Sequence, residues 1–477
     1  MTGRTIGALT ASLMLGAAAP APDTPPNVVV IVVDDLGYHD LGHTGSPIND
    51  TPRVDRLAAQ SARLVQGYAS YPRCTPSRYG LMTATYPVKE NKGNLGAIPA
   101  ASNFVQAFEA AGYDTRFVGK WHLGDGKSAP VGYGFDGSFG AGSAGGAGSH
   151  FYPFNTRERA SKKGDKAAIP DVKEAGSEGD NLNDVLTDDA IRFLRADREA
   201  PFLVMLNYYA VHTPIEAAPE DEARNAGDVA ATDYGSGPEY IREGTGRRKM
   251  RQDDAAYAAM VERMDDNVGR VLDALEAEGL AEDTIVVFTS DHGGLSNDGF
   301  KGERHLPTTN LPLRAGKGWL YEGGIRVPLF VRWPGQIAPR DETAVMLGMD
   351  VGPTLLDLAL DAELQDVDGE SFDAVLTDGL PAGMRPVFWH SRKARPHSTG
   401  DMPASAVRFG DYKLIHFFAD DRVELYDLAG DPGETEDLSE ADPERTERML
   451  AMLNAWRTQK AVSMKPGRVP KKKEKHR

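Results

Sequence analysis

The feature that most restricts the possible fold is a run of β-branched residues from Asn27 to Val33. A strand this uniformly apolar is typical of a sheet buried on both faces, because a strand with one exposed face alternates apolar and polar residues. Similar runs recur at Thr115–Val118, Phe202–Tyr209 and Thr284–Thr289. Between them, Asp254–Ala277 shows the apolar periodicity of a helix. This alternation predicts an α/β fold with a large, mostly parallel central sheet flanked by helices.

Three further patterns refine the prediction for the first part of the chain, residues 26–375. Thr51 followed by Pro52 predicts a helix start, with Thr51 as the N-cap. The Gly/Ser/Ala-rich segment Gly137–Gly148 and the basic stretch around Lys162 are expected to form a surface loop. The polar segment Ala217–Lys249 is expected to be an insertion, because segments of that length in a compact domain are usually lids, substrate walls or disordered.

The pattern changes after about residue 375. Short strand-like runs occur at 388–390, 406–409, 412–415 and 424–426, followed by a helical pattern at 443–456. These features predict a smaller C-terminal α+β subdomain, residues 376–460, with an antiparallel sheet. The last stretch, residues 461–477, ends in the basic run Lys471–Arg477 and is expected to be a disordered tail.

The leader and the overall charge limit the possible locations and partners. Residues 1–21 resemble a signal peptide, with Arg4 before the apolar run Ile6–Ala19, so we expect export to the periplasm or the medium. The alternative is a disordered Ala-rich leader. That run is too short to cross a bilayer comfortably, and no other stretch is long and apolar enough, so no membrane span is expected. The formal net charge of −17 argues against a generic nucleic-acid partner.

Acidic residues follow two of the expected strands. Asp34 and Asp35 come directly after the first strand, and Asp291 and His292 follow the strand that begins at Thr284. Ligands of open α/β sheets bind beyond the carboxyl ends of strands. Converging carboxylates repel one another unless a cation lies between them, and oxygen-rich sites suit Ca²⁺ or Mg²⁺ better than Zn²⁺. The alternative for Asp34 and Asp35 alone is a helix cap or a turn.

The chain contains a single cysteine, Cys74. Exported proteins use cysteines mainly in disulfide pairs, and one cysteine cannot form an intramolecular disulfide. Cys74 is therefore a buried thiol, an intermolecular linker or a reactive group. Its neighbours favour a reactive group, because Pro76, Ser77 and Arg78 follow it at a spacing that chance composition rarely produces.

The sequence Cys74-Thr75-Pro76-Ser77-Arg78 resembles the Cys-x-Pro-Ser-Arg signature of the type I, formylglycine-dependent sulfatases of the alkaline phosphatase superfamily. The resemblance implies that a formylglycine-generating or equivalent maturation enzyme converts Cys74 to an aldehyde, whose hydrate attacks sulfur and forms a sulfo-enzyme intermediate. It implies an alkaline-phosphatase-like fold. It also implies one Ca²⁺ per chain, with Mg²⁺ possible, held by Asp34, Asp35, Asp291, His292 and residue 74.

Three further blocks resemble parts of the same family. Gly119–Gly124 contains Lys120 and His122, Tyr209–Pro214 contains His212, and Lys317 precedes the block Tyr321–Pro328. The resemblance implies that these four side chains contact the sulfate or the nucleophile, together with Arg78. Each is compatible with a simpler role when taken alone, such as a turn histidine or a solvated lysine. Positioned cations suit the reaction, because charge develops on the oxygens of the transferring group.

One part of the signature differs from the family. The family pattern continues Leu-Thr-Gly-Arg, whereas this chain reads Leu81-Met82-Thr83-Ala84-Thr85, without Gly-Arg. In the family that arginine supports the site and the maturation signal. The difference leaves open a non-catalytic relative that binds sulfated glycans.

The expected substrate is a sulfated polysaccharide or its oligosaccharides. The basic stretch His390–His397 lies in the C-terminal region, and Arg73, Arg304, His305 and Arg314 flank the pocket motifs. In relatives such loops bind further anionic groups of a glycan, although a solvated basic loop gives the same pattern. A second alternative is a phosphonate monoester or phosphodiester hydrolase on the same scaffold, since such enzymes also carry Cys-x-Pro-Ser-Arg.

Overall fold

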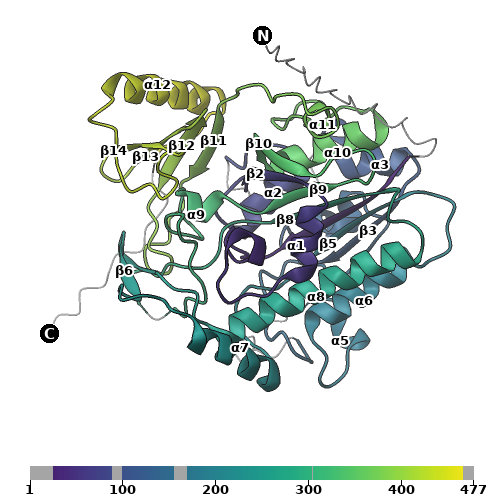
Figure 1. The fold of residues 1–477 in the computed structure, drawn as a ribbon. Coiled ribbons are helices and arrows are strands. Elements are labelled where there is room, and N and C mark those ends of the chain that lie inside the picture. Colours follow the sequence, from purple (N-terminus) through teal and green to yellow (C-terminus); the bar gives the residue numbers. More distant parts are fainter. Residues whose placement is uncertain (1–24, 89–98, 155–168, 303, 466–477) are drawn as a thin grey trace, which may run out of the picture.

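The computed structural model describes residues 25–88, 99–154, 169–302 and 304–465. The expected signal peptide, the Lys162 stretch and the run Lys471–Arg477 lie outside these residues. The large sheet has the strand order β10-β2-β9-β8-β1-β5-β3-β4 (Figure 1). Its strands are β1 (Asn27–Val33), β2 (Ala62–Tyr68), β3 (Asp114–Gly119), β4 (Gly137–Phe139), β5 (Phe202–Asn207), β8 (Thr284–Ser290), β9 (Leu329–Arg332) and β10 (Arg340–Leu347).

The run Asn27–Val33 forms the centre of this sheet, as the sequence predicts. β1 pairs in parallel with β5 and with β8, in the register Val30 to Met205 and Val30 to Val287. β9 runs antiparallel to both β2 and β8, so the sheet is mixed rather than wholly parallel. The α/β fold with a mostly parallel central sheet is confirmed.

Alternate residues of β1 contribute to two hydrophobic cores, one on each face of the sheet. Val29 and Ile31 pack on one side with α1 (Pro52–Ala59), α6 (Leu182–Leu194) and α8 (Ala255–Ala277). Val28 and Val30 pack on the other side, against α2 (Cys74–Thr83), α3 (Phe104–Ala110) and α10 (Val351–Leu360). Helices therefore cover both faces of the sheet (Figure 1). Because side chains on both faces of β1 are buried, every residue of this strand after Asn27 is apolar.

The helix ends follow from local hydrogen bonding. α8 begins after Asp254, whose side-chain oxygen accepts a hydrogen bond from the backbone N–H of Tyr257 at 3.0 Å. α1 begins at Pro52, as expected, but Thr51 differs from the expected cap. Its hydroxyl donates to the Asp55 carboxylate at 2.9 Å instead of accepting from the helix backbone.

The C-terminal region forms a second, antiparallel sheet of β11 (Val387–Ser391), β12 (Ala404–Phe409), β13 (Tyr412–Phe417) and β14 (Arg422–Asp427). The helix α12 (Pro443–Gln459) packs on one face of this sheet through Met449, Leu453 and Trp456. The other face packs against the aromatic residues Tyr68, Trp319 and Tyr321 of the larger part. The antiparallel sheet is confirmed, and the domain boundary at residue 375 stays a prediction.

The structure corrects one expectation about loops and adds detail to another. The segment 137–148 is not simply a surface loop, because it begins with β4, and Ala144 and Ala147 are buried in the core of the α8 face. The segment 217–249 contains a helix and a hairpin, because it places α7 (Pro219–Ala231) beside α8 and pairs β6 (Tyr240–Glu243) with β7 (Gly246–Lys249).

The remaining described elements are short. They are η1 (Gly42–Thr44), η3 (Ala100–Ser102), η4 (Gly126–Ser128), α4 (Pro130–Tyr133), α5 (Val172–Ala175), α9 (Glu322–Ile325), η6 (Gly348–Asp350) and α11 (Asp373–Leu376). Among the described helices, none combines the length and the apolar character needed to cross a membrane.

Candidate active site

The acidic residues expected at the strand ends meet at one edge of the large sheet. Asp34 and Asp35 follow β1, and Asp291 and His292 follow β8. Because these strands are parallel neighbours, with Val33 opposite Ser290, the two pairs leave the sheet side by side. The backbone N–H of Asp35 donates to the Asp291 carboxylate at 3.3 Å. All four residues are buried.

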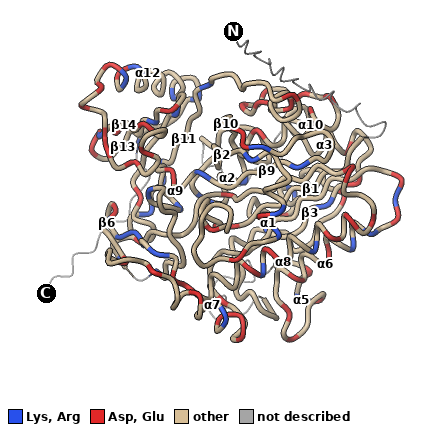
Figure 2. The backbone as a smooth tube through the Cα atoms, viewed as in Figure 1, with Lys and Arg blue, Asp and Glu red and all other residues tan. Residues whose placement is uncertain are grey.

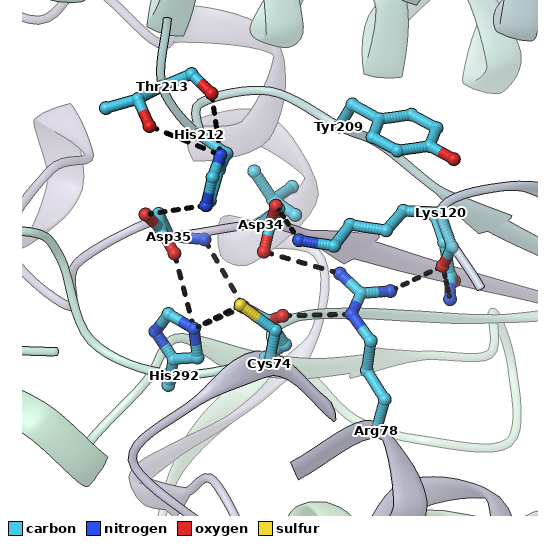
Figure 3. A network of polar contacts seen from close by, with 12 residues as sticks. Asp34, Asp35, Cys74, Arg78, Lys120, Tyr209, His212, Thr213 and His292 are labelled. Atoms are coloured by element: carbon cyan, nitrogen blue, oxygen red, sulfur yellow. Dashed lines mark hydrogen bonds and ion pairs between the residues drawn. The ribbon is translucent and has the colours of Figure 1, made fainter. Parts of the chain in front are cut away.

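Cys74 is the first residue of α2, and its buried side chain faces this edge. Its Sγ lies 3.2 Å from His292 Nε2 (Figure 3). Arg78 lies one turn further along α2. Its Nε donates to Asp291 at 2.9 Å and its Nη1 donates to the backbone oxygen of Lys120 at 2.7 Å. The signature spacing thus places thiol and guanidinium on the same side of one helix.

Further cations lie beside the carboxylates. The Lys120 ammonium, which follows β3, forms an ion pair with Asp34. The Lys317 ammonium lies 2.5 Å from Asp35 Oδ1. His212 Nε2 lies 3.9 Å from Asp35 Oδ2 (Figure 3). His212 Nδ1 donates to the backbone oxygen of Thr213 at 2.7 Å, which turns Nε2 toward the pocket.

The electrostatics of the pocket favour a negative charge at residue 74. Burial opposes ionisation of the Cys74 thiol, but Lys120 and Lys317 outweigh it and hold its pKa well below the usual value. Burial, together with Lys317, lowers the pKa of His212 to about 3. Burial also lowers the pKa of His122. In the free pocket both histidines are therefore neutral, whereas the two lysines supply positive charge.

The carboxylates fit a divalent cation. Burial and the neighbouring Asp291 raise the pKa of Asp34 well above its usual value, because buried carboxylates repel one another. Asp34 Oδ1 and Asp35 Oδ2 are buried and have no hydrogen-bond partner among the described residues. One potential ligand atom from each of Asp34, Cys74, Asp291 and His292 lies within 4.8 Å of the others. Unpaired carboxylate oxygens at this spacing suit a hard cation such as Ca²⁺ or Mg²⁺.

The residues expected at the site converge in one pocket. They are Asp34, Asp35, Cys74, Arg78, Lys120, His122, His212, Asp291, His292 and Lys317, and all but His122 and His212 are buried. His122 is close enough to hydrogen-bond with Cys74, and its backbone has a left-handed φ of 58°. Its ring lies beside the Gly-rich segment, as described below.

The flanking basic residues divide into two groups. Arg73 forms an ion pair with buried Asp401, and its Nη1 donates to the backbone oxygen of Lys393 at 2.9 Å, so it joins the residue before Cys74 to the C-terminal loop. Arg304 and Arg395 are electrostatically coupled to Cys74.

The second group of basic residues is engaged elsewhere. His305 Nε2 lies 2.5 Å from Asp254 at the start of α8. Arg314 forms an ion pair with Glu243 of β6 at 3.0 Å, and its guanidinium lies over the ring of Tyr321. In the basic stretch, His390 Nδ1 pairs with the Ser405 hydroxyl at 2.7 Å and is buried. All three side chains are therefore engaged by other residues of this chain.

The altered end of the signature lies at the end of α2. Ala84 is the C-cap, with a left-handed φ of 50°, a conformation that favours glycine. Thr85 takes the place of the family's arginine, and its hydroxyl pairs with that of Thr83 at 2.8 Å. The backbone of this segment therefore adopts the turn that glycine favours, although the residue is alanine.

Sequence reasoning missed two contributors to the pocket. Asp401 was not singled out, although it anchors Arg73. The pair Gly145-Gly146 was assigned to a surface loop, yet it lies against the rings of His122 and His212. The only pattern that the sequence offers in this segment is the alternation of alanines with glycines. That pattern does not indicate which residues the segment contacts.

Comparisons with known proteins agree with this geometry. The Sulfatase family model matches residues 26–362, and the model of the N-sulphoglucosamine sulphohydrolase C-terminal region matches residues 315–460. Steryl-sulfatase of Mus musculus is 30% identical over 93% of this chain and 83% of its own length. A sulfatase of Formosa agariphila is 30% identical over 90% of this chain and 88% of its own length.

Solved structures give the same result for the fold. The crystal structure of Ps i-CgsB in complex with k-i-k-neocarrahexaose superposes with a TM-score of 0.73 at 25% identity, covering 94% of this chain and 96% of that one. The alkaline-phosphatase-like fold is thereby confirmed. With its α/β sheet, its antiparallel C-terminal sheet and its extended sequence match, the chain belongs to the sulfatase family of the alkaline phosphatase superfamily and is a sulfuric ester hydrolase.

Proposed function

We propose that this protein is an exported sulfatase that removes sulfate from a sulfated polysaccharide or its oligosaccharides, using formylglycine formed from Cys74. The observation that carries the proposal is the position of Cys74 at the start of α2, between a carboxylate cluster and the ammonium groups of Lys120 and Lys317. Export is proposed from the leader, residues 1–21.

The nucleophile is proposed to be the hydrated aldehyde at residue 74, which supplies an oxygen for attack on sulfur. Arg78 fixes the geometry of this oxygen, because its guanidinium is held by Asp291 and by the backbone of Lys120. Asp291 is the nearby base that accepts a proton from the attacking hydroxyl group. A serine in this place would leave an ester that water must hydrolyse, whereas an aldehyde hydrate can release sulfate by re-forming its carbonyl group.

The cations of the pocket are proposed to bind the sulfate group and to manage its protons. Lys120 and Lys317 stabilise the charge that develops on the transferring oxygens. His212 or Lys317 protonates the departing alcohol. His212 is neutral in the free pocket, and a bound sulfate ester would raise its pKa, because a nearby negative charge favours the imidazolium form. His122 accepts the proton of the second hydroxyl group, so that sulfate can leave.

The metal is proposed to be one Ca²⁺, with Mg²⁺ as the alternative. Asp34, Asp35, Asp291 and His292 would hold it together with residue 74. A bound divalent cation supplies positive charge at the nucleophile and removes the repulsion among the carboxylates. His292 can serve as a ligand through Nε2, because its Nδ1 donates to the backbone oxygen of Gly293 at 3.0 Å.

The carbohydrate substrate is proposed from the charge of the pocket wall. Arg304 and Arg395 both interact electrostatically with residue 74, so two guanidinium groups lie near the reacting residue. The rest of the molecule is acidic, for example along α7, whose first turn carries Glu220, Asp221 and Glu222 (Figure 2). A substrate with further anionic groups near its scissile sulfate fits this wall, and Ps i-CgsB was solved with k-i-k-neocarrahexaose.

The test is a substrate panel applied to protein that was coexpressed with a formylglycine-generating enzyme. Release of inorganic sulfate from at least one sulfated oligosaccharide is expected, and Cys74→Ala should abolish it. A phosphonate ester is included in the panel. Its preferential cleavage would favour the phosphonate hydrolase alternative, and binding of glycans without turnover by fully matured protein would favour the binding-protein alternative.

A further inference from the structure

The Gly-rich segment that follows β4 leaves the large sheet next to the pocket. β4 pairs in parallel with β3, so Gly140 emerges beside Gly119, the residue before Lys120. The Tyr209 hydroxyl donates to the Gly140 backbone oxygen at 3.1 Å. The backbone N–H of Ser143 donates to Asp125 at 2.9 Å, which fixes the first half of the segment.

The second half is fixed to the segment that carries His212. The backbone N–H of Gly148 donates to Phe154 at 3.0 Å. The His150 N–H donates to Glu216 at 2.8 Å, and His150 Nε2 donates to the backbone oxygen of His212 at 2.8 Å. The segment is therefore held at both ends by hydrogen bonds.

The alanines of this segment pack in the hydrophobic core, whereas two of its glycines lie against the pocket. Ala144 and Ala147 are 3% and 2% exposed and pack in the hydrophobic core. Gly145 and Gly146, between them, lie against the two pocket histidines. A methyl group at residue 145 would lie 2.6 Å from His122 Nε2, and one at residue 146 would lie 2.9 Å from His212 Nδ1. Neither distance leaves room for a side chain.

We propose that Gly145 and Gly146 are positioning residues that hold the rings of His122 and His212 through direct contact with the backbone. Neither glycine is in the left-handed region, so an alanine is compatible with the backbone at both positions and the contact with the ring is what excludes it. A single segment thus sets the position of the two histidines that the proposed function uses for proton transfer. The kinetic part of this inference rests on that function.

The two glycines act on different steps. His122 is assigned to the release of sulfate, so displacing its ring slows the second half of the reaction. His212 is assigned to the sulfate ester and its leaving group, so displacing its ring slows the first half. Because a ring can rotate more easily than the fixed backbone can move, each substitution should displace the ring and leave the fold intact.

The test compares G145A and G146A with G142A in the same segment. A methyl group at residue 142 meets Asp125 and Pro170 at 3.4 Å, an ordinary contact distance. Crystal structures should show the His122 ring displaced in G145A and the His212 ring displaced in G146A, with the backbone of 140–148 in place. This readout needs no turnover. Unmoved rings, a displaced segment or failure to fold would each overturn the proposal.

Kinetics of matured protein provide the second readout. We expect kcat/KM to fall about 10²-fold in G146A, since misplacing a catalytic group by about 1 Å has this effect. In G145A, kcat and KM should fall together, with an initial burst of desulfated sugar, because sulfate release becomes rate-limiting. G142A should stay within about threefold of wild type. A reduced kcat without a burst in G145A would contradict the positioning role. If the wild type itself released no sulfate, the proposed function would fail while the ring positions could still be compared.

Discussion

At the residue scale, the pocket depends on charged side chains that are buried together. The positive charges of Lys120 and Lys317 lower the pKa of the Cys74 thiol. The helix that begins at Cys74 is bound to the end of β8 through the hydrogen bond from Arg78 to Asp291. Buried charges are tolerated only when each one is paired, so the loss of one partner should cost more than the pair contributes. This asymmetry makes single substitutions in and around the pocket informative.

The ion pair between Arg73 and Asp401 tests how much the loss of one partner of a buried charge pair costs, at a place outside the reacting groups. In Arg73→Ala, buried Asp401 loses its ion pair and the C-terminal loop loses the bond through the Lys393 backbone, so we expect a loss of about 3 to 5 kcal/mol in unfolding free energy. Denaturant unfolding measures it. The double variant with Asp401→Ala should lose less than the sum of the two single variants, and strict additivity would show that the pair is not coupled.

Metal removal tests the carboxylate cluster. Chelation should lower both the melting temperature and the activity, and Ca²⁺ should restore them. At a free Ca²⁺ concentration about 100 times the Kd, binding of the ion to the folded state raises the unfolding free energy by about 2.7 kcal/mol. Asp34→Asn should lose this response, whereas Asp341→Asn, exposed on β10, should keep it. An equal response to Ca²⁺ in Asp34→Asn would place the metal elsewhere.

At the element scale, a helix start and three strand ends place the nucleophile, the acidic pairs and one of the lysines. α2 begins at Cys74, β1 and β8 end at the acidic pairs, and the chain after β3 carries Lys120. The sequence was enough to predict β1, β3, β8 and α8, because uniform apolar runs and helical periodicity depend only on local patterning. It did not predict α2, because the stretch around Cys74 is charged and rich in turn residues. It was not enough for the Gly-rich segment, because glycine carries no side chain whose pattern reports what it contacts.

The start of α8 yields a prediction about stability. Asp254 caps the helix and also binds His305, so Asp254→Ala should lower the unfolding free energy by roughly 1 kcal/mol. Asp254→Ser should keep most of the wild-type stability, because serine is also a good N-cap. Thermal unfolding of the three proteins measures the effect. An alanine variant as stable as wild type would show that the cap contributes nothing.

At the scale of the whole molecule, the two sheets meet at a buried charge cluster. Lys413 of β13 pairs with Glu322 of α9 at 2.7 Å and with Glu434 at 2.6 Å. Lys317 lies five residues before Glu322 in the chain, so this cluster joins the C-terminal sheet to the segment that carries a pocket lysine. The strand-like runs of the sequence predicted the two sheets, whereas the pairing of charges between them depends on tertiary contacts that no local pattern contains.

This cluster should make stability depend on pH. Burial and the nearby Glu322 raise the pKa of Glu434 from 4.5 to about 7, although Lys413 opposes the shift. A carboxyl group with a raised pKa binds its proton more tightly in the folded state, so its stabilising contribution is complete below 4.5 and is lost as the pH rises toward about 7. Urea unfolding across this range should show a steeper decline for wild type than for Glu434→Gln. Parallel curves would contradict the assignment.

Sulfate ester hydrolysis by this protein is proposed to depend on an aldehyde at residue 74, and the dependence of rate on aldehyde content can be measured. Preparations matured to different extents are digested, and mass spectrometry of the peptide that contains residue 74 gives the fraction converted from thiol to aldehyde. The rate of sulfate release from the same preparations is then plotted against that fraction. If hydrolysis depends on the aldehyde, the points fall on a straight line through the origin. Turnover by a preparation whose residue 74 is entirely thiol would contradict this dependence.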